Sequence, residues 1–129
     1  MKNLEQIRAA KALAVAPKTS KTAVSKLPAM ILANGLLAAA AFAGEKKKDG
    51  KTPKRSEMKA ALDGVAEHLA AAELSITVLA NAKTGEDLIT KLSAADSGHL
   101  HRATSEALAF LSYVKRFTTK EGSEEKGED

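Results

Sequence analysis

The side chains most capable of chemistry in this 129-residue sequence are three histidines and paired carboxylates such as Glu86 and Asp87. The histidines are His68, His99 and His101. On a helix, His99 and His101 would point about 200° apart, so their two rings could not bind one metal ion. We expect the histidines to lie on the surface. Two carboxylates at a helix start are explained by the helix dipole and need no catalytic role.

Other catalytic and cofactor-binding patterns are absent from the sequence. The chain has no cysteine, which excludes disulfides, thiolate metal sites and cysteine nucleophiles, and which fits a reducing compartment. Its glycines are scattered, and none belongs to a G-x-x-x-x-G-K-S/T phosphate-binding loop. No nucleophile, base and orienting group can be assembled. We therefore expect a protein that is not an enzyme and that has no cofactor and no metal site.

The basic side chains carry more information. Residues 1–55 hold 12 Lys and Arg against 3 acidic residues, whereas residues 56–129 hold 8 against 13. Lysines of this kind can neutralise phosphates, with an affinity that falls steeply as salt rises. Only one Tyr and three Phe are available to stack on single-stranded bases, so sequence reading is not expected. The asymmetry favours a polyanion partner or head-to-tail protein contact, and the alternative is a solvated surface with a flexible charged tether.

The composition predicts the architecture that must position these groups. Alanine is abundant and aromatic residues are only 3% of the chain, which favours closely packed helices over strands. The length suits one domain with a single core. We predict an all-α, single-domain bundle of about five to six helices over residues 1–119. An exposed basic loop over residues 44–55 and a disordered polar tail over residues 120–129 complete the prediction.

The most apolar stretch is "LPAMILANGLLAAAAFAG", residues 27–44. It is shorter than the roughly 20 residues that a membrane span needs, Asn34 interrupts it, and it begins too far from the start for a signal peptide. We therefore predict a buried helix from Pro28 to about Ala43 in a cytoplasmic protein without membrane contact. Gly35 is expected to allow close approach of another backbone, and Asn34 to lie near a helix end or an interface. The flanking residues do not alternate in polarity, so a hairpin at Asn34-Gly35 is rejected.

Helical periodicity predicts a first helix over residues 4–15, ended by a proline. Residues 18–27 predict a short second helix, and Pro28 either kinks it or opens the next. Ser56 is expected to cap a helix that runs to about residue 73.

The second half contains one ambiguous segment and two more helices. "SITVLANAKTG", residues 75–85, has β-branched residues but no partner strand, so we predict an ordered connection. Thr84 and Asp87 form a capping-box pattern that starts a helix to about Ala95. Ser97 begins the last helix, which carries a wide apolar stripe.

Three segments together resemble the small α-helical subunit of the type III-B CRISPR RAMP-module (Cmr) complex. They are "EQIRAAKA" (5–12), "KLPAMILANGLLAAAAFAG" (26–44) and "AADSGHLHRATSEALAFLSYVKRFT" (94–118). That family has an R-x-x-x-A first helix, an LPxxIxxxGLxxxLAF helix and a C-terminal R-x-T-x-E-x-L-x-x-x-x-x-x-K-R-F pattern. The order and spacing fit, whereas residues 45–91 match only in helical character. The matching residues are Arg8, Ala12, Leu27, Pro28, Ile31, Gly35, Leu36, Phe42, Arg102, Thr104, Glu106, Leu108, Lys115, Arg116 and Phe117.

The resemblance implies a non-catalytic subunit of an RNA-guided complex in antiviral defence. In such an effector a guide RNA pairs with a target RNA on a filament of larger RAMP subunits, and the backbone subunit cleaves the target. Small subunits stack head to tail alongside and touch the large subunit, which suits the opposed charges of the two halves of this chain. Base pairing supplies specificity, so contacts to the phosphates of guide and target RNA are sufficient.

The resemblance also ranks the basic residues. Those in the matching segments are the preferred candidates for contact with RNA or a neighbouring subunit: Arg8, Lys11, Lys26, Arg102, Lys115 and Arg116. Those in the loop rank second, because the match does not reach them: Lys46, Lys47, Lys48, Lys51, Lys54 and Arg55. Arg8 and Arg102 could instead be structural, paired with acids such as Glu5 or Glu106.

Two other functions remain open on the sequence. A free-standing basic helical protein that coats nucleic acid or acts as an adaptor would bind generic nucleic acid tightly, cooperatively and without partners. A secreted or membrane-tethered protein is suggested only by the alanine-rich stretch.

Overall fold

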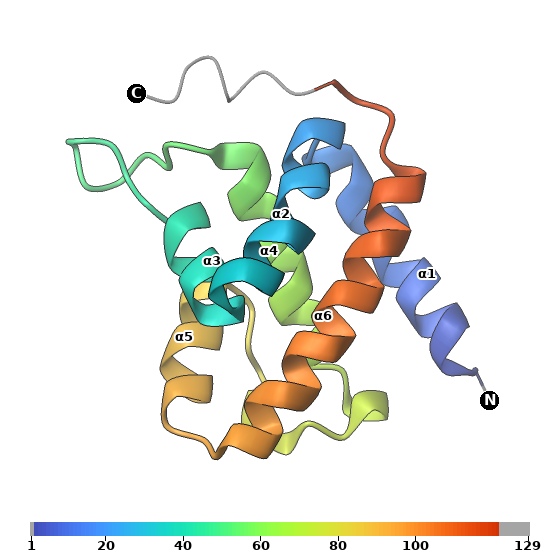
Figure 1. Cartoon of the computed structure of the whole chain (residues 1–129). Coiled ribbons are helices and arrows are strands. Elements are labelled where there is room, and N and C mark those ends of the chain that lie inside the picture. The colour runs from blue at the N-terminus through green and yellow to red at the C-terminus, as the bar shows by residue number, and fades with distance from the viewer. Residues whose placement is uncertain (1, 122–129) are drawn as a thin grey trace.

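The computed structural model describes residues 2–121, and this part of the chain forms six α-helices and no strand (Figure 1). The prediction of an all-α fold is therefore confirmed. The helices are α1 (Leu4–Val15), α2 (Lys21–Asn34), α3 (Leu36–Ala43), α4 (Ser56–Leu69), α5 (Gly85–Ser93) and α6 (Ser97–Phe117). Three short 3-10 turns join them: η1 (Ala16–Lys18), η2 (Ala72–Leu74) and η3 (Thr77–Leu79).

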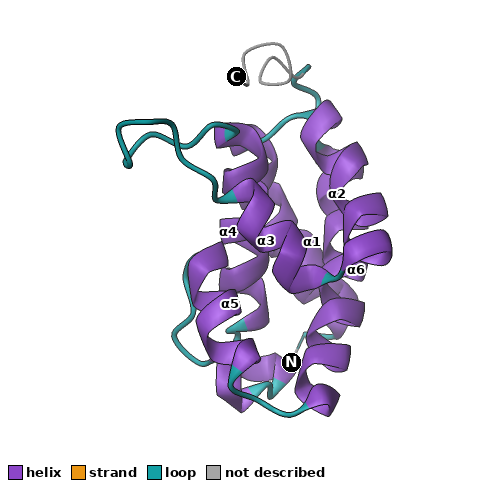
Figure 2. Ribbon diagram, turned by 60° about the vertical axis from the view of Figure 1, so that its left-hand side comes forward, coloured by secondary structure: helices purple, strands orange, loops and turns teal. Residues whose placement is uncertain are grey.

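Helix α4 is the central element and contacts each of the other five helices (Figures 1 and 2). Its predicted apolar face is buried and includes Met58, Leu62, Val65 and Leu69. The long helix α6 packs against α1, α2 and α4, whereas α3 packs against α5. The buried side chains of all six helices form one hydrophobic core.

The alanine-rich stretch forms two helices, so the prediction of one helix to Ala43 is wrong. Helix α2 continues through Pro28 to Asn34, and the chain breaks at Gly35 before α3 begins. Gly35 has φ 98° and ψ 158°, a conformation that is accessible almost only to glycine. A Cβ at Gly35 would meet no atom within 4 Å, so this glycine provides a backbone conformation and not close helix packing. Asn34 is exposed at the end of α2, as predicted.

The two helices nevertheless contribute to the core as expected for a buried stretch. Leu27, Ile31 and Leu36 are at most 2% exposed, and the small side chains of Ala39 and Ala40 let α3 pack closely. Within the described residues, no helix combines the length and the apolarity needed to cross a membrane.

Helix ends follow local capping chemistry in most places. The capping box between Thr84 and Asp87 is confirmed, since each accepts a hydrogen bond from the backbone of the other. The predicted Ser56 cap is wrong, because Ser56 is the first residue of α4 and no side chain caps that start. Helix α4 also ends earlier than predicted, at Leu69, because the chain turns so that Leu74 can enter the core.

The segment over residues 75–83 is an ordered connection, as predicted. It contains η3, and Ile76 and Leu79 from it are buried in the core.

Residues 122–129 of the predicted disordered tail lie outside the described residues. The first residue of that tail, Lys120, is tied to the body of the protein. Its carbonyl accepts a hydrogen bond from the backbone N–H of Lys21 at 2.8 Å, which satisfies an N–H at the start of α2. Its ammonium lies 2.9 Å from the carboxylate of Glu57, which is buried at the start of α4.

Candidate functional site

The loop over residues 44–55 forms a projecting hairpin, hereafter the basic hairpin. It leaves α3 and returns to α4, and Lys46 faces Pro53 in an antiparallel bridge (Figures 1 and 2). The backbone N–H of Lys54 donates to the carbonyl of Glu45 at 2.9 Å, and that of Lys47 donates to the carbonyl of Thr52 at 2.7 Å. These bonds give the loop a defined backbone.

The tip of the basic hairpin is fixed by one carboxylate. Asp49 accepts hydrogen bonds from the backbone N–H groups of Lys51 and Thr52 and from the Thr52 hydroxyl. These bonds, that of the Thr52 hydroxyl foremost, lower the pKa of Asp49 to about 2. Gly50 adopts φ 73°, which supplies the left-handed turn residue at low cost. The only acidic side chain in the tip therefore stabilises the turn.

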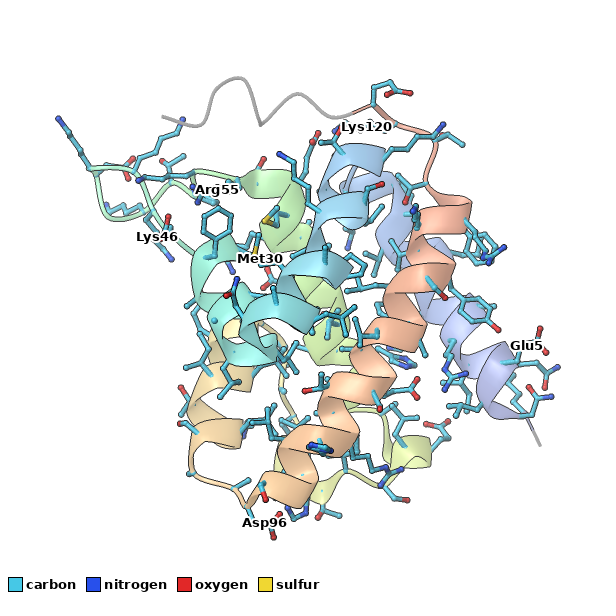
Figure 3. All side chains as sticks on the ribbon, viewed as in Figure 1. Glu5, Met30, Lys46, Arg55, Asp96 and Lys120 are labelled. Atoms are coloured by element: carbon cyan, nitrogen blue, oxygen red, sulfur yellow. The ribbon has the colours of Figure 1, made fainter. Side chains whose placement is uncertain are left out.

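Two basic residues at the base of the hairpin are engaged inside the protein (Figure 3). The Arg55 guanidinium lies 3.7 Å from the centre of the Phe42 ring, donates to the Phe42 carbonyl and pairs with Glu45 at 2.9 Å. The Lys46 ammonium lies 3.6 Å from Glu86, at the start of α5. Arg55 and Lys46 thus anchor the hairpin to α3 and α5.

The remaining four lysines of the hairpin point to solvent or lie at its surface. Within residues 2–121, no ion pair engages Lys47, Lys48, Lys51 or Lys54. An open hollow of about 390 Å³ is lined by three of them together with Asp49. The structure therefore divides the second-ranked candidates into two anchors and four available lysines.

The basic hairpin lies at the same end of the molecule as the start of α2 and the end of α6 (Figures 1 and 2). The Lys21–Lys120 and Lys120–Glu57 contacts join the starts of α2 and α4 to the chain that follows α6. Lys115 and Arg116 are exposed in the last turn of α6. We call this region the basic end, and it consists of the basic hairpin, the first turn of α2 and the last turn of α6. Figure 3 shows Asp96 at the opposite end of the molecule.

The other preferred candidates for contact with RNA or a neighbouring subunit lie outside the basic end. Lys11 is exposed on α1, and Lys26 is exposed on α2. Arg102 is near the start of α6, about 20 Å along the helix from Lys115 at a rise of about 1.5 Å per residue. It donates hydrogen bonds to the carbonyls of Leu74 and Ser75, and so it holds η2 against α6. The six preferred residues do not form one contiguous surface.

Arg8 has the structural role that the sequence left open. Its Nε and Nη2 atoms each donate to one carboxylate oxygen of Glu106 at 2.7 Å, in a bidentate ion pair between α1 and α6. The Glu106 side chain is only 10% exposed, and it also contacts His68 Nε2 at 2.8 Å. Arg8, whose side chain is 22% exposed, joins the buried Glu106 and His68 in one polar cluster, hereafter the buried triad.

His68 is fully buried, so the prediction of surface histidines is wrong for this residue. Its ring stacks on Phe110 at 4.4 Å between centroids, and its Nδ1 has no hydrogen-bond partner among residues 2–121. The consistent tautomer places the proton on Nε2, where it is donated to Glu106, and leaves Nδ1 as a bare acceptor. The sequence carried one signal of this burial, since His68 follows Ala61 and Val65 at helical spacing on the apolar face of α4.

Burial lowers the pKa of His68, and its effect outweighs the opposing influence of Glu106; Arg8 and Lys11 lower that pKa further. Burial also opposes ionisation of Glu106, but hydrogen bonds from Arg8 and His68 outweigh it and hold the pKa of Glu106 below its usual value. The triad therefore contains a neutral imidazole, a carboxylate and a guanidinium at neutral pH.

The buried triad predicts that acid destabilises the protein from about pH 6.5 downward. The unfolded chain binds a proton on His68 near its usual pKa of about 6.5, while the folded protein resists it, so the unfolded state is favoured as pH falls. We expect the melting temperature to fall between about pH 7 and about pH 5.5. In His68→Gln this part of the pH dependence should disappear, and an unchanged profile would contradict the assignment.

Comparison with known proteins gives one match. The family model Cas_Cmr5, described as a CRISPR-associated protein, matches residues 2–121. No curated protein and no solved structure matches the chain. The resemblance inferred from three segments is confirmed, and the match also includes the middle segment, residues 45–91.

Proposed function

The chain belongs to the Cas_Cmr5 family of CRISPR-associated proteins, and from this we propose that it is a non-catalytic small subunit of a type III-B RNA-guided interference complex. In this role it stacks beside the RAMP backbone, helps to hold guide and target RNA through their phosphates, and serves antiviral defence in the cytoplasm. The observation that carries the proposal is the family match over residues 2–121.

The charge distribution supports an assembly role. The basic end is separated from the end that carries Asp96, and Figure 3 shows Lys46 and Lys120 far from that residue. Two different surfaces on one protomer suit a heterologous contact, in which the basic end of one subunit meets another surface of the next. The same arrangement leaves RNA phosphates as an alternative partner for lysines that a neighbour does not cover.

The buried triad supports a non-catalytic role. His68 and Glu106 are the pair of side chains that most resembles a general base with an orienting carboxylate, yet both are buried. The other histidine–carboxylate contact, between His99 and Asp96, lies at the start of α6, where Asp96 also caps the helix. Each pair has a structural explanation.

A pull-down with sequencing of the bound RNA tests the proposal. The tagged chain is co-expressed with the other Cmr subunits and a guide, and we expect it to recover the RAMP subunits and an RNA of uniform length. The control is Lys83→Ala/Lys91→Ala, which removes one lysine just before α5 and one within it. This variant should recover the same partners. Recovery without RAMP subunits or guide, together with tight binding to generic nucleic acid, would instead support a free-standing nucleic-acid-binding protein.

A second experiment addresses catalysis. The isolated chain is incubated with guide and target RNA, and we expect no turnover. A turnover activity that disappears when one side chain is replaced would overturn the proposal.

A further inference from the structure

We propose that the basic hairpin is a preformed site for the phosphodiester backbone of double-stranded RNA, with Lys47, Lys48, Lys51 and Lys54 as its binding residues. The inference deepens the proposed function, on which it rests for the choice of RNA as the polyanion. It assigns the binding site to four named side chains and assigns the class of RNA they contact.

The first support is the division of roles within the hairpin. Arg55 and Lys46 are engaged with the protein at the base, and the carboxylate of Asp49 is engaged by Lys51 and Thr52 at the tip. The four other lysines have no ion-pair partner within residues 2–121. Their charges are therefore available to an external anion.

The second support is the order of the backbone. The Lys46–Pro53 bridge, the Lys47–Thr52 hydrogen bond and the turn at Asp49 fix the hairpin before any ligand is bound. A loop that is already ordered does not lose backbone entropy on binding, so more of the electrostatic attraction appears as affinity. A flexible charged tether, the alternative that the sequence left open, would lack these bonds.

The third support concerns the class of RNA. Proteins that bind single strands stack bases on aromatic rings, but the hairpin has none. The nearest aromatic residue along the chain, Phe42, has the Arg55 guanidinium over its ring. Contacts limited to phosphates favour the duplex, because paired strands present a higher density of negative charge than one strand.

The experiment uses the isolated full chain and a fluorescently labelled RNA duplex of about one guide length, roughly 20 base pairs. Binding is measured by anisotropy over a series of salt concentrations. For Lys47→Ala/Lys48→Ala/Lys51→Ala/Lys54→Ala we expect affinity at low salt to fall at least about tenfold, and the slope of log K against log salt to become shallower by about 0.9 for each phosphate that the variant no longer neutralises. The single strand of the same sequence should bind more weakly than the duplex.

A matched pair of variants separates position from total charge. Lys48→Ala/Lys51→Ala and Lys83→Ala/Lys91→Ala each remove two positive charges, but only the first pair lies in the hairpin. We expect only the hairpin pair to reduce the salt slope. Equal reductions in both would overturn the site and indicate a diffuse effect of net charge. Unchanged melting temperatures would show that both variants remain folded.

Asp49→Ala tests the preformed backbone. This variant makes the protein more positive, so charge alone would strengthen RNA binding, whereas disruption of the turn should weaken it. We expect weaker binding, and tighter binding would overturn the preformed site.

The result can be separated from the test of the proposed function, because it needs no other subunit. Failure of the isolated chain to distinguish hairpin variants would overturn this inference while leaving assembly into the complex intact. If the four-lysine variant keeps its RNA affinity but no longer joins the complex, the hairpin binds a protein subunit and the inference is wrong.

Discussion

Glu106→Ala is expected to destabilise the protein by about 3–5 kcal/mol. The Glu106 carboxylate, on α6, joins Arg8 of α1 to His68 of α4. Its removal leaves a partly buried guanidinium and a fully buried imidazole N–H without their acceptor, so that their desolvation is no longer compensated. Urea unfolding followed by circular dichroism measures the change.

The control for this prediction is a matched acid on the surface. Glu67 lies on α4, is exposed and has no ion pair among the described residues, so Glu67→Ala should change the free energy of unfolding by at most about 0.5 kcal/mol. In a double-mutant cycle, Arg8→Ala/Glu106→Ala should cost less than the sum of its single variants, since the same ion pair is broken in each. If the stability losses of the two single variants add up to that of the double variant, Arg8 and Glu106 do not stabilise the protein through a shared interaction.

Gly64→Ala is expected to destabilise the protein by about 1–3 kcal/mol, although alanine is the better helix former. Gly64 lies in α4 where α1 crosses it, and an added Cβ would lie 2.5 Å from Cγ2 of Val15. Real atoms cannot approach so closely, so α1 and α4 would have to separate. Thermal and urea unfolding measure the decrease in stability.

Two variants make this prediction specific. Gly98→Ala, at the exposed start of α6, adds the same methyl group without a severe clash and should stabilise the helix by up to about 1 kcal/mol. Val15→Ala removes the two methyl groups that meet the new Cβ, so the double variant Val15→Ala/Gly64→Ala should be less destabilised than additivity implies. Equal effects at Gly64 and Gly98 would be inconsistent with a close crossing.

Features of the fold that depend on local chemistry could be predicted from the sequence. The helix over residues 4–15 has helical periodicity, and the Thr84–Asp87 cap needs only four consecutive residues. The break at Gly35 could not be predicted in the same way. Glycine permits both a continuous helix and the observed turn, and the choice depends on how α2 and α3 pack around it.

The candidate site shows the same limit. The basic loop over residues 44–55 was recognisable because it contains glycines, a proline and many lysines. The sequence could not show that Lys46 and Arg55 anchor the loop, since their partners are decided by the positions of α3 and α5. The hydrogen bond that lets His68 be buried could not be predicted either, because its acceptor, Glu106, is 38 residues away in the sequence.

The contact between Arg8 and Glu106 joins residues 98 positions apart, and it fixes the order in which a newly made chain can fold. Helix α1 is synthesised well before its principal neighbour, α6. The contacts between α1 and α6 therefore form only after α6 has been synthesised, and closure of the bundle is a late step in folding. Until then the amino-terminal segment offers chaperones an exposed apolar helix face.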